Sequence, residues 1–284
     1  MALEFKGVEF SYSKKNDEKA LKNINIRINE KDEFVTILGH TGSGKTTLLH
    51  HINGLVLPSS GEVHVFDKVI TSKKRNNPKM KDVRKKIGFV FQFPEYQLFE
   101  ETVLKDIMFG PINFGFSKEE AEQSALKYAK LLQIEHLLDK SPFELSGGQM
   151  RKVAIAGILA YEPEILLLDE PTRGLDPKGS KDIMEFFSRV NKEFQKTIIM
   201  ITHDMDIAYK YAKRMIVLKD GEMTFDGSKH ELFSNNTYKE YHLSKPLIVE
   251  LIDEINNELK LGIEHSITDL DELFCVLRGE DNGL

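Results

Sequence analysis

The segment that most constrains the fold is Phe34–Leu49, in which an apolar run stops at a glycine-rich turn that ends in a lysine and two threonines. Glycines leave no side chain between the backbone and a polyphosphate, so successive N–H groups can point inward and the following helix can present its positive end. The glycines are Gly39, Gly42 and Gly44. A lysine and a hydroxyl at the end of such a loop reach the β- and γ-phosphates and Mg²⁺, which predicts these roles for Lys45 and Thr46.

The surroundings of this loop favour a phosphate-binding role. Residues 34–38 read as a buried strand before the loop, and the apolar residues after it read as one face of a helix. These apolar residues are Leu48, Leu49 and Ile52. A bare match to the pattern can arise by chance in any glycine-rich turn, but the mechanism requires this order of strand, loop and helix.

Composition bounds the fold class and the partners. With 284 residues, 40% of them hydrophobic, the chain can form one large α/β domain with an appendage, or two small domains. The single cysteine, Cys275, excludes an internal disulfide and is expected to pack in the core. A net charge of −6 provides no global basic field, so nucleic acid is not an expected partner. No uncharged apolar run reaches about 18 residues, so we do not expect the chain to enter a membrane by itself.

Two predicted strands lie upstream of the loop. Leu3–Phe10 alternates apolar and polar residues as an edge strand, and Leu21–Ile28 alternates as a second strand that leads to the loop. Tyr12 follows the first strand directly, where an aromatic ring could stack on an adenine. Packing on the strand is the commoner role for such an aromatic, so the residues alone leave both roles open.

Polar side chains follow two further predicted strands. Gln92 comes directly after the buried run Ile87–Phe91, and His203 follows the buried run Thr197–Thr202. The carboxyl ends of parallel strands meet at one sheet edge, which is where α/β proteins bind ligands. We therefore expect Gln92 to reach Mg²⁺ or the attacking water, and His203 to sense the γ-phosphate.

A carboxylate pair ends another buried run. Glu164–Pro171 contains four consecutive apolar residues that read as a fully buried parallel strand, and Asp169 and Glu170 emerge at its carboxyl end. Asp169 is placed to hold Mg²⁺, and Glu170 to polarise a water for in-line attack on the γ-phosphate. Such a pair is weak evidence alone and strong evidence behind a phosphate-binding loop.

A second anion site is predicted at Leu145–Gln149, which we call the signature segment. Its sequence, LSGGQ, opens a predicted helix with small residues whose N–H groups are free. One chain with two phosphate sites could bind two phosphates, or it could contribute each as half of a site shared with a second copy.

The segment Phe93–Phe99 is unusually apolar for a loop. Its large residues lie between a proline and several glutamates, which is poorly suited to an interior. These residues are Phe93, Tyr96, Leu98 and Phe99. An exposed apolar cluster of this kind predicts a docking site for a partner protein.

Together, these motifs resemble those of ABC-type ATPases over about residues 3–230. The motifs are Tyr12, GHTGSGKTT, Gln92, LSGGQ, ILLLDE, RGLD and His203. The resemblance implies an α/β P-loop NTPase fold with a RecA-like parallel sheet core, an N-terminal antiparallel β subdomain, a helical signature subdomain and a small C-terminal helical extension. It implies an ATP-binding domain over residues 1–228, with its helical subdomain at about 95–162, and an extension over 229–284.

The same resemblance implies hydrolysis of ATP with Mg²⁺, in a head-to-tail dimer whose signature segments cap the γ-phosphate held by the other subunit. In this resemblance Tyr12 would stack on the adenine of ATP. The other implied ATP contacts are Gly39, His40, Thr41, Gly42, Ser43, Gly44, Lys45, Thr46, Thr47, Ser146, Gly147, Gly148 and Gln149. Implied metal ligands are Thr46, Gln92 and Asp169, and implied catalytic residues are Glu170, His203 and Gln92.

His40, the FQFPEYQLFEETV segment and the C-terminal extension are more closely similar to the second, A-prime ATPase of energy-coupling factor transporters, a cobalt-type, CbiO-like family. That resemblance implies a peripheral subunit at the cytoplasmic face of the membrane that powers uptake of vitamins or metal ions. Its partners would be a second ATPase subunit, a membrane T component docking near Phe93–Phe99 and, indirectly, a substrate-binding S component. A homodimer is the alternative to the heterodimer.

Two features stay open at this stage. Residues 229–284 carry apolar stripes but no catalytic motif, so we expect them to hold two ATPase subunits together, although they could pack on their own domain. Arg173 departs from the alanine or serine that many family members have before the glycine, which leaves the cross-talk between the two sites undefined.

Other functions fit the motifs less well. The alternatives are a subunit of another ABC importer or a mechanical ATPase of DNA repair or translation. Repair proteins of this type insert long coiled coils and translation factors carry two cassettes, and neither pattern is present. A small-molecule P-loop kinase would leave the signature segment unexplained, and a binding module would lack turnover.

Overall fold

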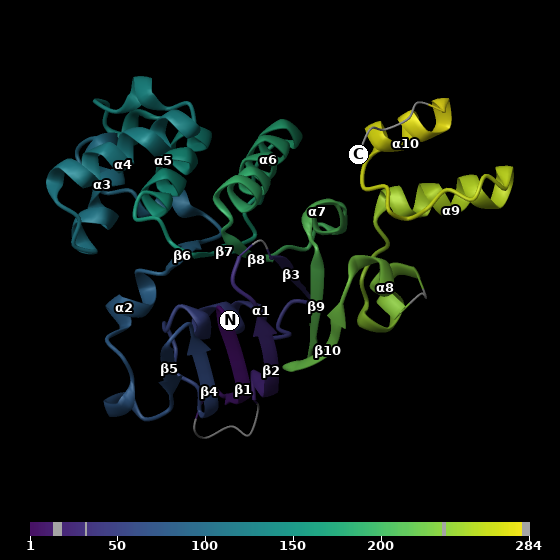
Figure 1. Ribbon diagram of the computed structural model, residues 1–284, viewed down its shortest axis with the longest axis horizontal. Helices are drawn as coiled ribbons and strands as arrows, with labels where there is room; N and C mark the ends of the chain where they lie inside the picture. Colours follow the sequence, from purple (N-terminus) through teal and green to yellow (C-terminus); the bar gives the residue numbers. More distant parts are fainter. Residues whose placement is uncertain (14–18, 32, 235–236, 280–284) are drawn as a thin grey trace.

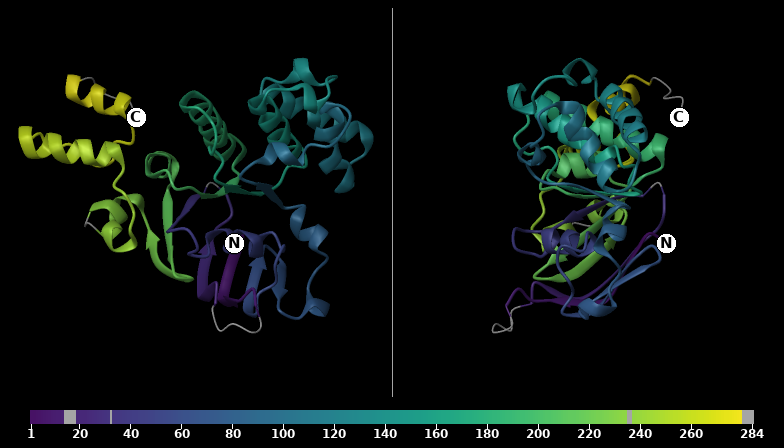
Figure 2. Two further views of the ribbon diagram at one scale, coloured as in Figure 1. Left: turned by 180° about the vertical axis from the view of Figure 1, so that it is seen from behind. Right: turned by 90° about the vertical axis from the view of Figure 1, so that its left-hand side faces the viewer.

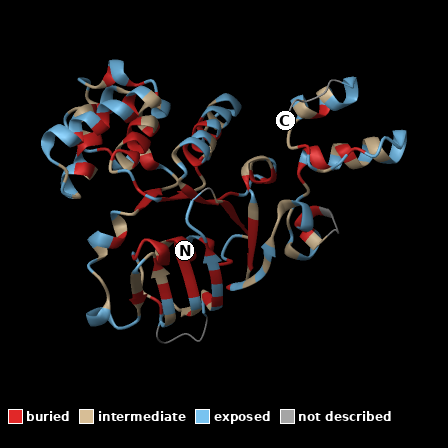
Figure 3. Cartoon of the chain, in the orientation of Figure 1, coloured by how far each residue is buried: buried red, intermediate tan, exposed pale blue. Residues whose placement is uncertain are grey.

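Two β-sheets form the centre of the computed structural model, which describes residues 1–13, 19–31, 33–234 and 237–279 (Figure 1). Helix α1 (Lys45–Ile52) lies between the two sheets, α6 (Pro177–Phe194) and α7 (Met205–Tyr211) lie on the other side of the larger sheet, and further helices lie at both ends of the molecule (Figure 1). Buried side chains concentrate in the strands, whereas much of the helical surface is exposed (Figure 3).

The larger sheet is parallel except at one edge. Its six strands lie in the order β10-β9-β3-β8-β7-β6, and only the described pair β9–β10 is antiparallel. The strands are β3 (Phe34–Leu38), β6 (Ile87–Val90), β7 (Ile165–Asp169), β8 (Thr197–Ile201), β9 (Arg214–Lys219) and β10 (Glu222–Gly227). All residues of β3, β6 and β8 are buried, as expected of continuous apolar runs covered on both faces. The predicted buried parallel strands are confirmed.

The smaller sheet is antiparallel, in the order β2-β1-β4-β5. Its strands are β1 (Leu3–Phe10), β2 (Leu21–Ile28), β4 (Ser60–Val65) and β5 (Lys68–Thr71). The prediction that Leu3–Phe10 forms an edge strand is wrong, because β1 pairs with β2 on one side and with β4 on the other. Alternation reports that one face is buried, but it does not reveal a pairing partner that arrives some fifty residues later in the chain.

Helix α1 (Lys45–Ile52) joins the two sheets. Its Leu48, Leu49 and Ile52 are at most 1% exposed and share one core cluster with residues of both sheets. Burying an aliphatic side chain of this size contributes about 1.5–3 kcal/mol. The helix that begins at the phosphate loop is therefore fixed from both sides.

Three helices form a layer at one end of the molecule: α3 (Val103–Asn113), α4 (Lys118–Leu131) and α5 (Gly147–Leu159) (Figures 1 and 2). Their apolar faces share a core with β7 and β8. Ser117 and Glu120 cap α4 reciprocally. The other helical elements between β5 and β8 are η1 (Lys74–Asn76), α2 (Met80–Arg84), η2 (Pro94–Gln97), η3 (Glu135–Leu137), η4 (Pro142–Glu144) and α6 (Pro177–Phe194).

The segment Phe93–Phe99 is only partly exposed. Tyr96 is 81% exposed, but Leu98 is 7% exposed and belongs to the core of the helical layer. The expectation that Leu98 lies on a docking surface is therefore wrong. The short helix η2 turns the chain, so the side chain that follows it points inward.

The C-terminal helices lie at the end opposite to α3–α5, as Figure 1 and the left view of Figure 2 show. They are α8 (Lys229–Ser234), η5 (Thr237–Tyr241), α9 (Leu247–Leu259) and α10 (Leu270–Arg278), and they follow α7 (Met205–Tyr211) and the β9–β10 hairpin. Val249 and Ile252 are fully buried in one cluster with Tyr209 of α7 and Val217 of β9. Asp253 of α9 pairs with Lys245 and, at 2.7 Å, with His265 Nε2.

The outer faces of α9 and α10 remain exposed (Figure 3). Cys275 is only partly buried there, so the expectation that it packs in the core is wrong. Within the described ranges, no helix has the length and apolar character needed to cross a bilayer. The residues that end the chain, 280–284, lie outside the described part.

Candidate nucleotide-binding site

A cleft of about 870 Å³ opens at the carboxyl edge of the parallel sheet; we call it the nucleotide cleft. The phosphate loop and the ends of β6, β7 and β8 all contribute to it. Its lining includes Tyr12, Thr41, Gly42, Gly44, Lys45, Thr46, Thr47, Gln92, Asp169, Glu170 and His203. The fold thus brings together all strand-end residues that the sequence singled out.

The loop itself forms an open cradle. A Cβ at Gly42, where φ is +87°, would meet nothing within 4 Å, so the space beside its Cα is open to a ligand. A Cβ at Gly39 would lie 2.1 Å from the Leu218 carbonyl oxygen, so only glycine allows the loop to pass β9 this closely. Lys45 Nζ donates to the carbonyl oxygens of Gly39 (2.7 Å) and His40 (2.9 Å). Burial lowers the pKa of Lys45, while the charges of Glu170 and Asp169 raise it.

The oxygen donors beside the lysine suit a hard cation. The carboxylate of Asp169 accepts a hydrogen bond from Thr46, and burial raises the pKa of this carboxyl group against the opposing charges of His50 and Lys45. Carboxylate and hydroxyl oxygens are ligands that Mg²⁺ accepts, with waters and phosphate oxygens completing its shell. Among the described residues no group of three or more histidine, cysteine or carboxylate side chains forms a self-contained metal site. The donor set therefore fits a Mg²⁺ ion that arrives with a nucleotide.

Glu170 is held in a strained conformation next to His203. Its φ of +52° lies in the left-handed region, and its N–H donates to the Ile201 carbonyl at 3.0 Å. His203 Nε2 lies 3.3 Å from Glu170 Oε1. Burial and then the charge of Asp169 raise the pKa of Glu170, and burial lowers the pKa of His203. The pair therefore combines a carboxylate with increased proton affinity and an imidazole with decreased proton affinity.

Gln92 contacts Arg173, the residue that departs from the family pattern before the glycine. With the amide oriented so that its oxygen faces the guanidinium, Gln92 accepts hydrogen bonds from Arg173 Nη1 and, at 3.0 Å, from Arg173 Nε. Arg173 also lines the nucleotide cleft. The sequence predicted the place of Gln92 but not this partner, because the two residues are brought together only by the pairing of β6 with β7.

Tyr12 lies at the rim of the cleft with 68% of its surface exposed. Its hydroxyl is 2.9 Å from Thr47 Oγ1, and the edge of its ring contacts Phe10 at 4.8 Å between centroids. The ring is oriented by these contacts without being buried by them. A nucleobase can therefore stack on it.

The turn between β9 and β10 also borders the cleft, and sequence reasoning did not assign it to the site. Asp220 Oδ1 lies 3.2 Å from His40 Nε2, and the Gly221 N–H donates to the Ser43 carbonyl at 3.2 Å. Lys19, Ala20 and Lys22 line the same rim. The Asp-Gly pair signals a turn, but no local pattern shows that the turn lies against the phosphate loop.

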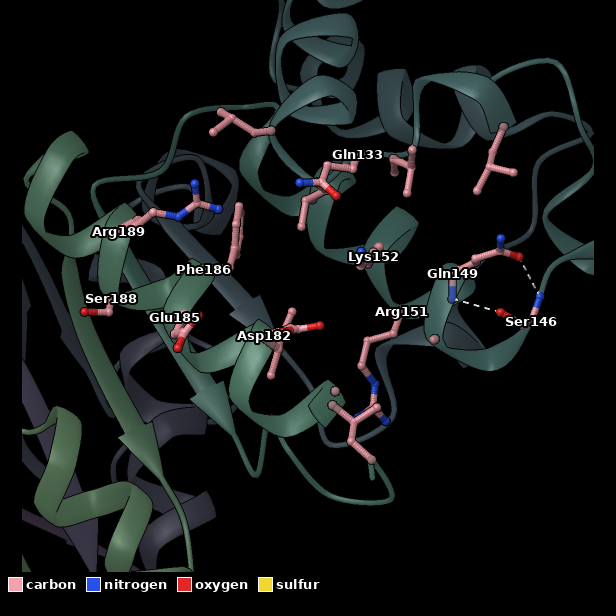
Figure 4. A pocket seen from close by; sticks show the side chains of 18 of the residues that line it. Gln133, Ser146, Gln149, Arg151, Lys152, Asp182, Glu185, Phe186, Ser188 and Arg189 are labelled. Carbon is pink, nitrogen blue, oxygen red and sulfur yellow. Dashed lines mark hydrogen bonds between the residues drawn. The ribbon is translucent and has the colours of Figure 1, made fainter. Parts of the chain in front are cut away.

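The signature segment lies in a different cleft. Ser146 caps α5, donating its backbone N–H to Gln149 Oε1 at 3.0 Å and accepting the Gln149 N–H at 3.4 Å (Figure 4). This second cleft, of about 930 Å³, runs between the start of α5 and α6. Ser146, Gly148 and Gln149 are absent from the lining of the nucleotide cleft. The described chain thus places its two predicted anion-binding elements in separate clefts.

Comparison with known proteins gives concordant matches. Residues 21–173 match the family described as ABC transporter. The energy-coupling factor transporter ATP-binding protein EcfA2 of Enterococcus faecalis is 50% identical over 259 residues, covering 90% of this chain and 89% of that protein. The protein of the same name from Bacillus licheniformis is 51% identical over 237 residues, covering 82% of this chain and 81% of that protein.

Solved structures agree with these sequence matches. CbiO1 from Clostridium perfringens, described as part of the ABC transporter complex CbiONQ, aligns with a TM-score of 0.75 at 37% identity, covering 91% of this chain and 96% of that one. The dimeric ATP-binding cassette MJ0796 in a post-hydrolysis state with ADP and Pi aligns with a TM-score of 0.68 at 36% identity, covering 80% of this chain and 98% of that one.

The raised pKa of Glu170 predicts an acid limb in the rate of nucleotide hydrolysis. A carboxyl group accepts a proton only in its ionised form, so the rate falls as pH drops through the raised pKa, which lies above the ordinary value of 4.5. We expect kcat at saturating nucleotide, measured from about pH 4 to 8, to decrease toward acid pH while circular dichroism stays constant. A rate that is flat across this range contradicts Glu170 as the proton acceptor.

Proposed function

The chain belongs to the ABC transporter family, and within it to the ATP-binding subunits of energy-coupling factor transporters; on that premise we propose that it powers uptake of a vitamin or metal ion through membrane T and S components. The activity of the family is ATP hydrolysis. The observation that carries the proposal is the convergence of Lys45, Asp169, Glu170 and His203 in one cleft.

The chemistry assigned to this chain is proton transfer and charge placement. Glu170 accepts the proton of a water, and its raised pKa makes it a stronger base than an exposed glutamate. His203, 3.3 Å from that carboxylate, orients it and is placed to detect the γ-phosphate. Lys45 exchanges the carbonyl oxygens of Gly39 and His40 for phosphate oxygens, which removes the cost of burying its charge without an anionic partner.

Thr46, Gln92 and Asp169 are the proposed ligands of Mg²⁺, and to serve as one Gln92 would turn its amide oxygen away from Arg173. When bound, the ion neutralises phosphate charge and fixes the position of the γ-phosphate. Tyr12 stacks on the adenine, since its ring is exposed and oriented by Thr47.

Replacing Glu170 by Gln should preserve ATP binding and abolish turnover, because the amide keeps the shape but is a far poorer base. We expect kcat to fall by about a hundred-fold or more, with an ATP-stabilised dimer accumulating in size-exclusion chromatography. Glu164→Gln is the matched control, because Glu164 adjoins the opposite end of the same strand and is exposed. A Glu170→Gln variant that keeps more than about a tenth of wild-type activity would exclude this role.

A second ATPase subunit completes each site in this proposal. Ser146, Gly147 and Gly148 of the signature segment are exposed, and the segment lies apart from the nucleotide cleft of its own chain, so it is available to cap the phosphate of a partner. The partner is a second, A-type ATPase, with a homodimer as the alternative. The backbone N–H groups at the start of α5 would provide the contact, assisted by the helix dipole.

We further propose that Phe93, Tyr96, Phe99 and Phe109 form a docking surface for the membrane T component. Their exposed fractions range from 37% to 81%, and their rings make paired contacts: Phe93 with Tyr96 at 5.7 Å and Phe99 with Phe109 at 4.7 Å. An exposed aromatic cluster of this size is typical of a protein-binding surface. Docking there would hold the subunit at the cytoplasmic face of the membrane.

Tyr96→Asp should uncouple the ATPase from its membrane partner. A charge at the centre of an apolar interface is costly to desolvate, but at 81% exposure it does not disturb the fold. We expect wild-type hydrolysis by the isolated ATPase subunits and loss of co-purification with the T component. Leu126→Asp, on α4 at 45% exposure, is the control that should leave assembly intact. Equal assembly of Tyr96→Asp and wild type refutes the docking surface.

The exposed apolar residues of α9, α10 and the loop between them are the proposed contact between ATPase subunits in the absence of ATP. These residues are between 41% and 63% exposed, whereas Val249, Ile252 and Leu273 of the same helices are buried. The exposed residues are Leu247, Leu259, Leu261, Leu270, Phe274, Val276 and Leu277. Exposed apolar residues on short helices require a covering surface, and a second subunit provides one.

Phe274→Asp should weaken subunit pairing without nucleotide. Phe274 is 52% exposed, so the substitution leaves the buried anchor of Val249 and Ile252 in place. We expect analytical ultracentrifugation to show a shift toward monomer, both alone and mixed with the second ATPase subunit, while Leu126→Asp behaves as wild type. Unchanged association would show that these residues do not form a pairing surface.

A further inference from the structure

Arg151 makes an unusual set of buried contacts two residues after the signature segment. The side chain is about as buried as the core, with 6% of it exposed, and its carboxylate partner Glu95 is 15% exposed. Arg151 Nε donates to Glu95 Oε2 at 3.1 Å and Nη2 donates to Glu95 Oε1 at 3.0 Å. The remaining nitrogen, Nη1, donates to the Arg173 carbonyl oxygen at 2.9 Å and approaches the Pro171 carbonyl oxygen at 3.4 Å. All three nitrogens of the planar guanidinium thus donate hydrogen bonds. A lysine has a single ammonium nitrogen and could not make this set of contacts.

These contacts join three segments that have separate functions. Arg151 belongs to α5, whose first turn is the signature segment; Figure 4 shows its side chain extending away from Ser146. Glu95 belongs to η2 and directly precedes Tyr96 of the docking surface. The accepting carbonyl groups belong to the turn that directly follows Glu170.

The same turn is tied to two residues of the nucleotide cleft. The Arg173 N–H donates to the Glu170 carbonyl at 3.0 Å, and the Arg173 side chain donates to the Gln92 amide oxygen. Gln92 is three residues before Glu95 in the chain, and the Glu95 carboxylate accepts hydrogen bonds from Arg151. The contacts therefore form a closed ring through Gln92, Glu95, Arg151, Arg173 and back to Gln92, with Glu170 attached to it.

We propose that Arg151 is a positioning residue that couples the docking surface and the signature segment to the catalytic turn. A displacement at Tyr96 moves Glu95, and the bidentate pair transmits that movement both to the start of α5 and to the backbone carbonyls beside Glu170. This inference rests on the proposed function, since it assigns the route by which the T component acts on hydrolysis. Pairing buried charges in a fork geometry selects one arrangement of these segments, which is the role best attested for such pairs.

Three variants test the proposal in the complete transporter and in the isolated ATPase pair. Arg151→Lys keeps the charge but loses the fork, and Glu95→Gln keeps the shape but loses the charge. Arg151→Met combined with Glu95→Met removes the whole pair without leaving an unpaired buried charge, so it keeps the fold. Tyr161→Phe is the matched control, because Tyr161 follows α5 and its hydroxyl donates to the Ile87 carbonyl at 3.1 Å, which ties the far end of α5 to β6.

We expect kcat of the ATPase pair to fall by about tenfold or more in all three variants, since a small misplacement of catalytic groups is costly, while KM for ATP stays within about twofold. We also expect the T component to bind each variant but no longer to change its hydrolysis rate. The Arg151→Met and Glu95→Met double variant should lose no more than the worse single variant, because both residues act in one contact. Tyr161→Phe should retain kcat and the effect of the T component.

Several results would overturn the inference. They are wild-type kcat in the variants, a rise in KM that accompanies the fall in kcat, retained regulation by the T component, or an equal loss in Tyr161→Phe. A wild-type ATPase pair whose rate does not respond to the T component overturns it as well. Failure of the wild-type chain to hydrolyse ATP in any assembly would instead refute the proposed function.

Discussion

The parallel register of β3, β8, β7 and β6 is the constraint on which the site depends. Val90 pairs with Leu168, Leu168 pairs with Met200, and Ile37 pairs with Ile201, so the strands end nearly level. The first residues beyond these ends therefore face a common space at the start of α1. A slip of one residue in any pair would turn a side chain of the nucleotide cleft to the opposite face of the sheet.

This arrangement buries opposite charges close together. Burial lowers the pKa of Lys45 and raises the pKa values of Asp169 and Glu170, and each effect is opposed by the charge of the other partners. Glu170 also adopts a left-handed conformation, which costs about 1–3 kcal/mol for a residue with a side chain. Hydrogen bonds from its N–H to Ile201 and from the Arg173 N–H to its carbonyl hold it there. The site therefore contains buried charges that a bound nucleotide and its metal ion can stabilise.

In a single chain the signature segment does not reach the nucleotide cleft, and two apolar surfaces have no covering partner among the described residues. The signature segment opens into a cleft of its own, and apolar surfaces remain exposed at both ends of the molecule, around Tyr96 and around Phe274. Apolar surface of this kind is stable in water only at a cost, so it is typical of interfaces. The buried pair of Arg151 and Glu95 lies between the signature segment and the first of these surfaces, where it can link them mechanically to Glu170.

The sequence by itself determined the order of buried strands, the phosphate loop and the residue types at the strand ends, because apolar periodicity and glycine spacing are local properties. It could not show that β1 is an inner strand, that Leu98 is buried or that Asp220 lies against His40, since each depends on a distant segment. Tertiary structure alone decided which apolar faces stay open and where the signature segment lies. It also decided that Arg151 meets Glu95, which is 56 residues away along the chain, because only the packing of α5 against η2 brings their charges together.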